Sequence, residues 1–219
     1  AWASEWLAET VRLAGLEPTP RVREEIWAAL AALAEAPVSQ RTLTVFCALV
    51  QDRAVAAALE PLTLKGPHGA LLDGEGAALG TSRFDTFELE TLMATPSAVA
   101  PVLSALFREL EQGFDGRPTL LILDEAWLFL GETAFAAKIR EWLKTLRKKR
   151  VAVMFATQSL DDVAASAIAA SLIESCPTQV FLPNPRAMEP SSAALYRGFG
   201  LNRRQLERSE EHTSELQSP

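Results

Sequence analysis

Residues 120–125, with the sequence LLILDE, decide the fold class of this chain. Four consecutive branched apolar residues predict a strand that is buried on both faces, as in a parallel sheet. A second apolar run at 151–156 (VAVMFA) predicts another buried strand, and a helical pattern at about 132–149 lies between the two. Strand, helix and strand in succession indicate an α/β fold with a mainly parallel sheet.

The first segment of the chain has a different pattern. Residues 1–62 predict helices only, and the glycines and prolines between 61 and 80 predict turns and loops. The elements expected outside the two buried strands are helices at 1–14 and 39–60, a helix with Thr19 as N-cap and Pro20 in its first turn, a strand at 83–89, a helix at 97–112, a helix capped by Ser159 with Asp162, and a last strand at 178–182.

Composition excludes several classes of protein. At 219 residues and 48% hydrophobic residues the chain can bury a substantial core, and its apolar runs are far shorter than the roughly 20 residues that cross a bilayer. The first residues carry acids where a secretory leader carries bases. A net charge of −7 argues against general affinity for nucleic acid, although a local basic patch could make transient contacts. Cys47 and Cys176 are expected to be reduced packing residues.

The residues at the carboxyl ends of the two predicted strands suit phosphoryl chemistry. In open α/β sheets ligands bind beyond these ends. Asp124 could hold the Mg²⁺ that neutralises the phosphates of ATP, and Glu125 could polarise the attacking water. Thr157 and Gln158 follow the second strand, where the amide of Gln158 could bind the γ-phosphate or that water. The alternative is that these polar residues only solvate the strand ends.

A basic segment, KTLRKKR at 144–150, precedes the second predicted strand. It could be a solvated helix end whose cations complement the helix dipole, or a patch that contacts nucleic acid. It could also offer an arginine to the ATP site of a neighbouring subunit. Because that role uses the planar guanidinium group, Arg147 and Arg150 are its candidates.

The phosphate-binding half of an ATP site is missing from the sequence. A phosphate loop has the form GxxxxGK[ST], and no Gly-Lys pair occurs in the chain. The loop GEGAALG at 74–80 has no lysine, so we reject it as the phosphate cradle. His68, in GPHG, is expected to be a turn residue rather than a base or a metal ligand.

Longer motifs carry a family resemblance. The segments FDGRPTLLILDEAWLFL (114–130), WLKTLRKK (142–149), FLPNP (181–185) and LYRGFGLNRRQLE (195–207) closely resemble the conjugal-transfer ATPases of type IV secretion systems, the TrbE-like family. The resemblance implies a RecA-like P-loop NTPase motor domain, with an all-helical insertion at 1–62 and a partial ATPase core at 63–207. In that family the phosphate loop precedes the insertion, so we expect this chain to be a fragment without it. Residues 208–219 look like a translated sequencing adapter and are expected to be a non-native tail.

The resemblance also implies a function and its cofactors, ATP and Mg²⁺. The intact protein would be a hexameric ATPase that powers pilus assembly or substrate transfer. It would be cytoplasmic, associated peripherally with the bacterial inner membrane and with the inner-membrane components of the secretion system. Asp124 would hold Mg²⁺ through water, Glu125 would be the base, Gln158 the γ-phosphate sensor beside Thr157, and Arg147 the residue offered in trans.

Three points stay open at this stage. The family usually has Asn at the position of Arg150, which favours Arg147 as the trans arginine. A DNA-pumping coupling protein or translocase would share the acids and the glutamine, and a non-catalytic assembly scaffold would need neither. By itself this chain is expected to hydrolyse ATP poorly, because it lacks the phosphate loop.

Overall fold

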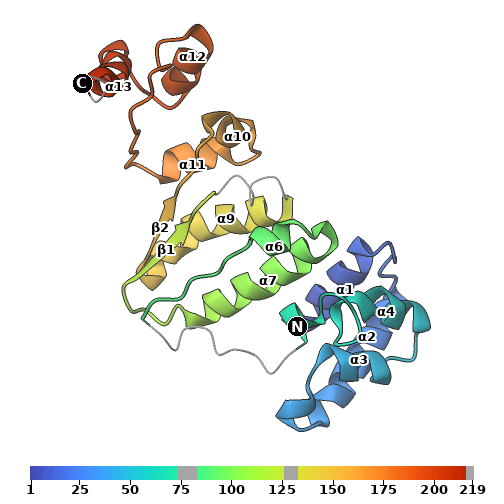
Figure 1. Cartoon of the computed structure of the whole chain (residues 1–219). Coiled ribbons are helices and arrows are strands. Elements are labelled where there is room, and N and C mark those ends of the chain that lie inside the picture. Colours follow the sequence, from blue (N-terminus) through green and yellow to red (C-terminus); the bar gives the residue numbers. More distant parts are fainter. Residues whose placement is uncertain (74–82, 126–132, 216–219) are drawn as a thin grey trace. The chain divides into compact units, whose positions relative to one another are not determined.

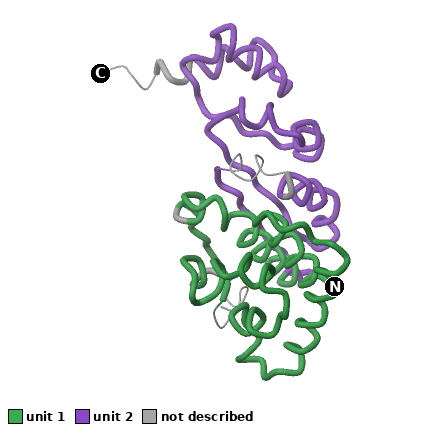
Figure 2. Tube along the Cα trace, turned by 90° about the vertical axis from the view of Figure 1, so that its right-hand side faces the viewer, with its two compact units in different colours: residues 1–113 green, residues 114–219 purple. Residues whose placement is uncertain are grey.

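The chain forms two compact units, residues 1–113 and residues 114–219 (Figure 2). We describe it from a computed structural model, which describes residues 1–73, 83–125 and 133–215. The division lies further along the chain than the predicted domain boundary at residue 62. The reason is that α7 (Pro96–Gly113) packs against α1 (Trp2–Leu13) and Trp6 Nε1 donates a 3.0 Å hydrogen bond to Pro101 O. The proposed domain assignment itself stays a prediction.

Unit 1 is helical throughout its described residues (Figure 1). Two of its helices begin as the sequence predicts: α1 comes first, and Thr19 caps α2 by accepting a 3.3 Å hydrogen bond from Val22 N. Apolar residues at helical spacing on α1 and α2 form the core with Phe46, Val55 and Leu59. The helices of unit 1 are α1, α2 (Pro20–Glu35), η1 (Val38–Gln40), α3 (Leu43–Leu49), α4 (Arg53–Leu59), η2 (Glu60–Leu62), α5 (Gly69–Leu72), α6 (Glu90–Met93) and α7.

The single helix predicted at 39–60 is wrong. The structure has α3 and α4 there, separated by an extended residue, Val50, with ψ 130°. Asp52 starts the second helix, since its carboxylate accepts hydrogen bonds from Ala54 N at 2.8 Å and Val55 N at 3.4 Å. Apolar periodicity alone does not reveal this break, because both short helices present apolar residues to the same core.

A buried carboxylate closes the last described turn before residue 74. Asp73 is 1% exposed, and its Oδ2 accepts hydrogen bonds from the hydroxyl and the backbone N–H of Thr44 and from Leu64 N. The backbone is packed tightly nearby, because a Cβ added to Gly69 would lie 2.1 Å from Thr63 O. Three segments of unit 1 distant in sequence are thereby tied together.

The strand predicted at 83–89 is also wrong. These residues form no ladder within the described portion of the chain, and the ring of Phe84 is 82% exposed. Apolar and polar residues alternate there, but a strand also needs a neighbour to take its backbone hydrogen bonds. The loop GEGAALG at 74–80 lies outside the described residues.

Unit 2 contains a small parallel sheet with helices, so the chain has an α/β fold. Strands β1 (Thr119–Leu123) and β2 (Val151–Phe155) pair in parallel from Thr119↔Val151 to Leu123↔Phe155. Helix α9 (Thr133–Thr145) runs alongside them (Figure 1) and buries Phe135, Ile139 and Trp142. The other helices of this unit are η3 (Leu146–Lys149), α10 (Leu160–Ala165), α11 (Ala169–Ser175), α12 (Pro190–Gly198) and α13 (Arg203–Glu215).

Burial on both faces of β1 is not what the structure shows. Leu123 is buried, whereas Leu120 is 56% exposed and Ile122 is 52% exposed, and Met154 of β2 is 51% exposed. One face of the sheet is packed and the other presents apolar side chains to solvent. Four apolar residues in a row are compatible with either arrangement, because only the surrounding elements decide which face is covered.

The predicted strand at 178–182 is absent from the described structure. One of its residues, Phe181, packs its ring against Tyr196 and Phe199, while Val180 is 81% exposed. Side-chain packing against α12 thus replaces pairing with a strand. Helix α13 includes residues from the predicted tail, and Ser209 O accepts a 3.1 Å hydrogen bond from Asn184 N.

Candidate functional site at the strand ends

The structure brings together the polar residues that follow β1 and β2. The parallel pairing continues to the end of both strands, where Ala156 N donates a 3.0 Å hydrogen bond to Leu123 O. Beyond this point the side chains of Glu125 and Gln158 meet: Gln158 Nε2 donates to Glu125 Oε1 at 2.5 Å. Two residues 33 positions apart therefore share one site, as the expected parallel topology requires.

Glu125 has an unusual backbone conformation. Its φ is 51°, in the left-handed region that costs a residue with a Cβ about 1 kcal/mol. Its N–H donates a 3.1 Å hydrogen bond to Asp124 Oδ1. Conformations of this kind cluster at functional sites, where the surrounding structure maintains them. Here the conformation turns the chain sharply at the end of β1 and leaves Asp124 exposed and Glu125 half-buried.

Hydroxyl groups hold the turn that carries Gln158. Thr157 Oγ1 donates to Ser159 O and accepts from Ser159 N, both at 3.1 Å. Ser159 Oγ then accepts a 3.2 Å hydrogen bond from Asp162 N and caps α10. The cap was predicted from the sequence, but the hydroxyl ring of Thr157 was not. A threonine two residues before a helix N-cap was the available signal, since Thr and Ser favour such local rings.

The two candidate arginines lie away from this site in unit 2. Arg147 is in η3 and Arg150 follows it, so both precede β2 at the opposite end of the strands. Five strand residues span about 16 Å. Arg150 has φ 60° and closes the turn, with its N–H donating to Arg147 O at 3.1 Å. Within one chain neither arginine joins Glu125 and Gln158.

The donor groups at the strand ends fit some of the needs of a magnesium–phosphate ligand. Mg²⁺ usually keeps several waters and binds through one or two carboxylates together with substrate phosphates, so the exposed carboxylate of Asp124 is a suitable group. No cluster of three or more metal-binding side chains exists among the residues that the structure describes. His68 N donates to Pro61 O at 3.0 Å, as expected for a turn residue.

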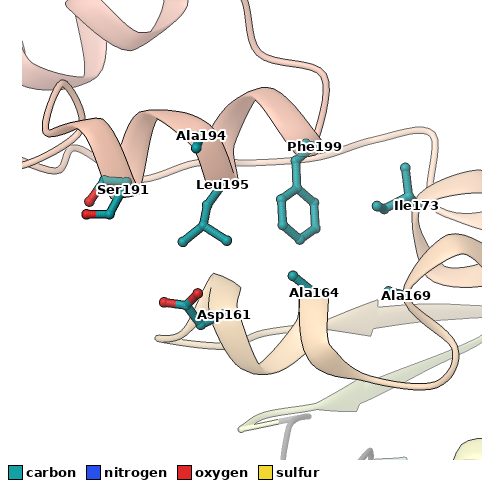
Figure 3. A pocket seen from close by; sticks show the side chains of 10 residues that line it. Asp161, Ala164, Ala169, Ile173, Ser191, Ala194, Leu195 and Phe199 are labelled. Atoms are coloured by element: carbon teal, nitrogen blue, oxygen red, sulfur yellow. The ribbon is translucent and has the colours of Figure 1, made fainter.

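A separate hollow of about 560 Å³ lies between α10, α11 and α12 (Figure 3). Ile173, Leu195 and Phe199 project into it, and Asp161 is at its edge. Its other lining residues are small: Ala164, Ala169, Ala194, Gly198 and two serines, Ser191 and Ser192. The hollow does not include Glu125 or Gln158, so we do not assign the phosphoryl chemistry to it.

Comparisons with known proteins identify relatives along nearly the whole chain. A probable conjugal transfer protein TrbE of Sinorhizobium fredii is 46% identical over 208 residues, which cover 94% of this chain and 31% of that protein. The conjugal transfer protein TrbE of Rhizobium radiobacter is 45% identical over 208 residues, covering 94% of this chain and 25% of that protein. No protein-family profile matches the chain.

A more distant relative broadens the comparison. The type IV secretion system protein virB4 of Bartonella henselae is 31% identical over 186 residues, which cover 83% of this chain and 24% of that protein. The chain thus spans less than a third of the length of these relatives. Among the described residues, no helix combines the length and the apolar character needed to cross a membrane. The chain belongs to the TrbE family of conjugal transfer proteins, which is related to the virB4 proteins of type IV secretion systems.

Proposed function

We propose that this chain contributes the magnesium and water side of an ATP-hydrolysing site in a RecA-like motor domain. The observation that carries the proposal is the contact between Gln158 and Glu125 at the carboxyl ends of two parallel strands. Parallel strands that end in a carboxylate pair and a neutral amide offer the groups that phosphoryl transfer to water needs. The motor would serve a type IV secretion system, powering pilus assembly or substrate transfer.

Each residue has a role that its position allows. The exposed carboxylate of Asp124 is suited to hold a water-coordinated Mg²⁺, which supplies charge neutralisation at the phosphates. Glu125 is the base that accepts a hydrogen bond from the attacking water. Gln158 donates to the γ-phosphate, and Thr157 lies beside it with its hydroxyl engaged in the turn.

The basic turn before β2 is assigned to a neighbouring subunit. Arg147 is exposed and lies at the far end of the strands from Glu125, so it can stabilise the transition-state charge only in another copy of the chain. This arrangement implies a ring of subunits, which we propose to be a hexamer. The ring would be cytoplasmic and would dock on the inner-membrane components of the secretion system.

The substitution Glu125→Gln in the full-length protein that contains this chain tests the proposal. We expect ATP turnover to fall by about 100-fold or more, roughly the contribution of a positioned base, with Mg²⁺–ATP binding retained. The matched control is Glu174→Gln on α11, an exposed carboxylate away from the strand ends. Near-normal turnover of Glu125→Gln would remove Glu125 from this role. A wild-type protein that binds no nucleotide would favour the scaffold instead.

A further inference from the structure

The hydrogen bond between Gln158 and Glu125 joins two groups that the proposed reaction needs separately. The carboxylate of Glu125 must accept from water, and the amide of Gln158 must donate to the γ-phosphate. In the structure, one N–H of Gln158 is instead directed at Glu125 Oε1. The base and the sensor are thus engaged with each other.

We infer that this contact is a resting pair, which the γ-phosphate of ATP opens by competing with Glu125 for the amide of Gln158. The inference concerns the regulation of the proposed ATP site and rests on that function. In the resting state the sensor occupies an oxygen of the base. When a γ-phosphate takes the amide, that oxygen becomes available to the attacking water, so the base is released only when there is a phosphate to cleave.

The backbone on both sides is arranged to hold this pair. Thr157 and Ser159 close a ring of two hydrogen bonds around Gln158, and Ser159 anchors the turn to α10. On the other strand, the left-handed conformation of Glu125 directs its side chain independently of β2. Because each residue is positioned by its own turn, opening the pair requires rotation of side chains rather than movement of the strands.

Charge and exposure make the pair reversible. Gln158 is exposed and Glu125 is half-buried, so water and ligands can reach the contact. An amide N–H binds a charged acceptor more strongly than a neutral one, and a γ-phosphate presents more negative charge than a carboxylate. ADP lacks this group. We therefore expect the pair to stay closed with ADP and to open with ATP.

The closed pair can be tested directly in the 219-residue chain by ¹⁵N NMR of glutamine side-chain amides. The Gln158 signal is assigned by its loss in Gln158→Leu. Replacing Glu125 by Leu should shift this signal towards those of the exposed glutamines, whereas Glu174→Leu should leave it in place. Thr157→Val should also shift it and Thr157→Ser should not, since only the hydroxyl closes the turn. A Gln158 signal that is unmoved in a folded Glu125→Leu variant would overturn the closed pair.

Competition with the γ-phosphate is tested by a double-mutant cycle in the full-length protein. Binding of the non-hydrolysable analogue AMP-PNP and of ADP is measured with Mg²⁺ for wild type, Glu125→Ala, Gln158→Ala and the double variant. Loss of Glu125 should tighten AMP-PNP binding about fivefold more when Gln158 is present than when it is absent, the scale of coupling between contacting residues. ADP binding should show no such coupling.

The cycle separates the two possible failures. If the protein binds AMP-PNP but the effect of Glu125→Ala is the same with and without Gln158, the resting pair is wrong and the proposed ATP site stands. If the wild-type protein binds neither nucleotide, the proposed function fails and the inference fails with it. Equal coupling for ADP and AMP-PNP also overturns the inference, because the γ-phosphate would then not be the group that opens the pair.

Discussion

Glu125 and Arg147 lie at opposite ends of the same two parallel strands. Glu125 follows the last residues of β1, and Arg147 lies in the short helix that precedes β2, whose first residue, Val151, pairs with Thr119 at the start of β1. Since the strands separate them by about 16 Å, one chain cannot bring both to one phosphate.

This separation predicts complementation between two inactive variants of the full-length protein. Arg147→Ala and Glu125→Gln should each reduce ATP turnover strongly when assembled alone. Mixed rings should regain activity, because an Arg147→Ala subunit still offers Glu125 and its Glu125→Gln neighbour still offers Arg147. The measurement is ATPase activity after the two variants are unfolded together and reassembled. Mixtures no more active than the separate variants would show that Arg147 does not act in trans.

Arg150 occupies a position that favours a residue without a bulky Cβ branch. With φ 60° it adopts the left-handed conformation that ends a helix, where Gly and Asn are preferred. Arg150→Gly should therefore stabilise the chain by about 1 kcal/mol, and Arg150→Asn by less. The free energy of unfolding in urea checks this, with Lys148→Gly in the preceding turn as the control, which should destabilise. The Asn that the family resemblance places here would then reflect the backbone rather than catalysis.

Asp73 should make unit 1 sensitive to acid. Burial raises the pKa of its carboxyl, but hydrogen bonds from Thr44 and from Leu64 N outweigh burial, so the pKa lies below the ordinary value. A lowered pKa stabilises the fold above the unfolded value, about 3.9, and this stabilisation is lost as the pH falls through the folded value. Asp73→Asn should cost about 2 kcal/mol at pH 7 and flatten the loss of stability below about pH 4.

The control for Asp73 is Glu24→Gln, which changes an exposed carboxylate on α2. Urea unfolding from about pH 7 down to about pH 3 measures both variants. The assignment fails if Asp73→Asn has the stability and the pH dependence of the wild type.

Gly69 and Gly198 should respond in opposite ways to the same substitution. A Cβ at Gly69 would lie 2.1 Å from Thr63 O and 2.7 Å from Leu64 N, both backbone atoms that cannot swing away. Gly69→Ala should cost about 2 kcal/mol or more, as overpacking does. Gly198 is the last residue of α12 and has nothing within 4 Å of such a Cβ. Gly198→Ala should be neutral or slightly stabilising by thermal unfolding, and equal effects at the two glycines would contradict this account.

The burial of Cys47 predicts an unreactive thiol. Burial is the main cause that raises its pKa to about 11, and the charges of Asp73 and Glu60 act in the same direction. At pH 8 only about 0.1% of this thiol would be ionised, against roughly a quarter of an ordinary cysteine. Labelling by iodoacetamide at about pH 8 should therefore be slow for folded Cys47 and fast after unfolding. Rapid labelling in the folded state would contradict its burial.

Local signals predicted the strands and helices that local residues decide. Thr19 marks the start of α2, and the apolar runs beginning at Leu120 and Val151 mark β1 and β2. The same reasoning failed at 83–89 and 178–182, where the residues alternate like a strand but find no neighbouring strand in the described structure. Strand pairing depends on a partner elsewhere in the chain, so alternation by itself is insufficient.

The sequence by itself determined the α/β character, the polar residues at the strand ends and the family resemblance. These follow from hydrophobic pattern and residue identity, which are properties of short segments. Only the tertiary structure decided that Gln158 donates to Glu125, that Glu125 adopts a left-handed backbone, and that Arg147 lies at the far end of the strands. These relations depend on the parallel register of β1 and β2, and residues 33 positions apart meet only when that register forms.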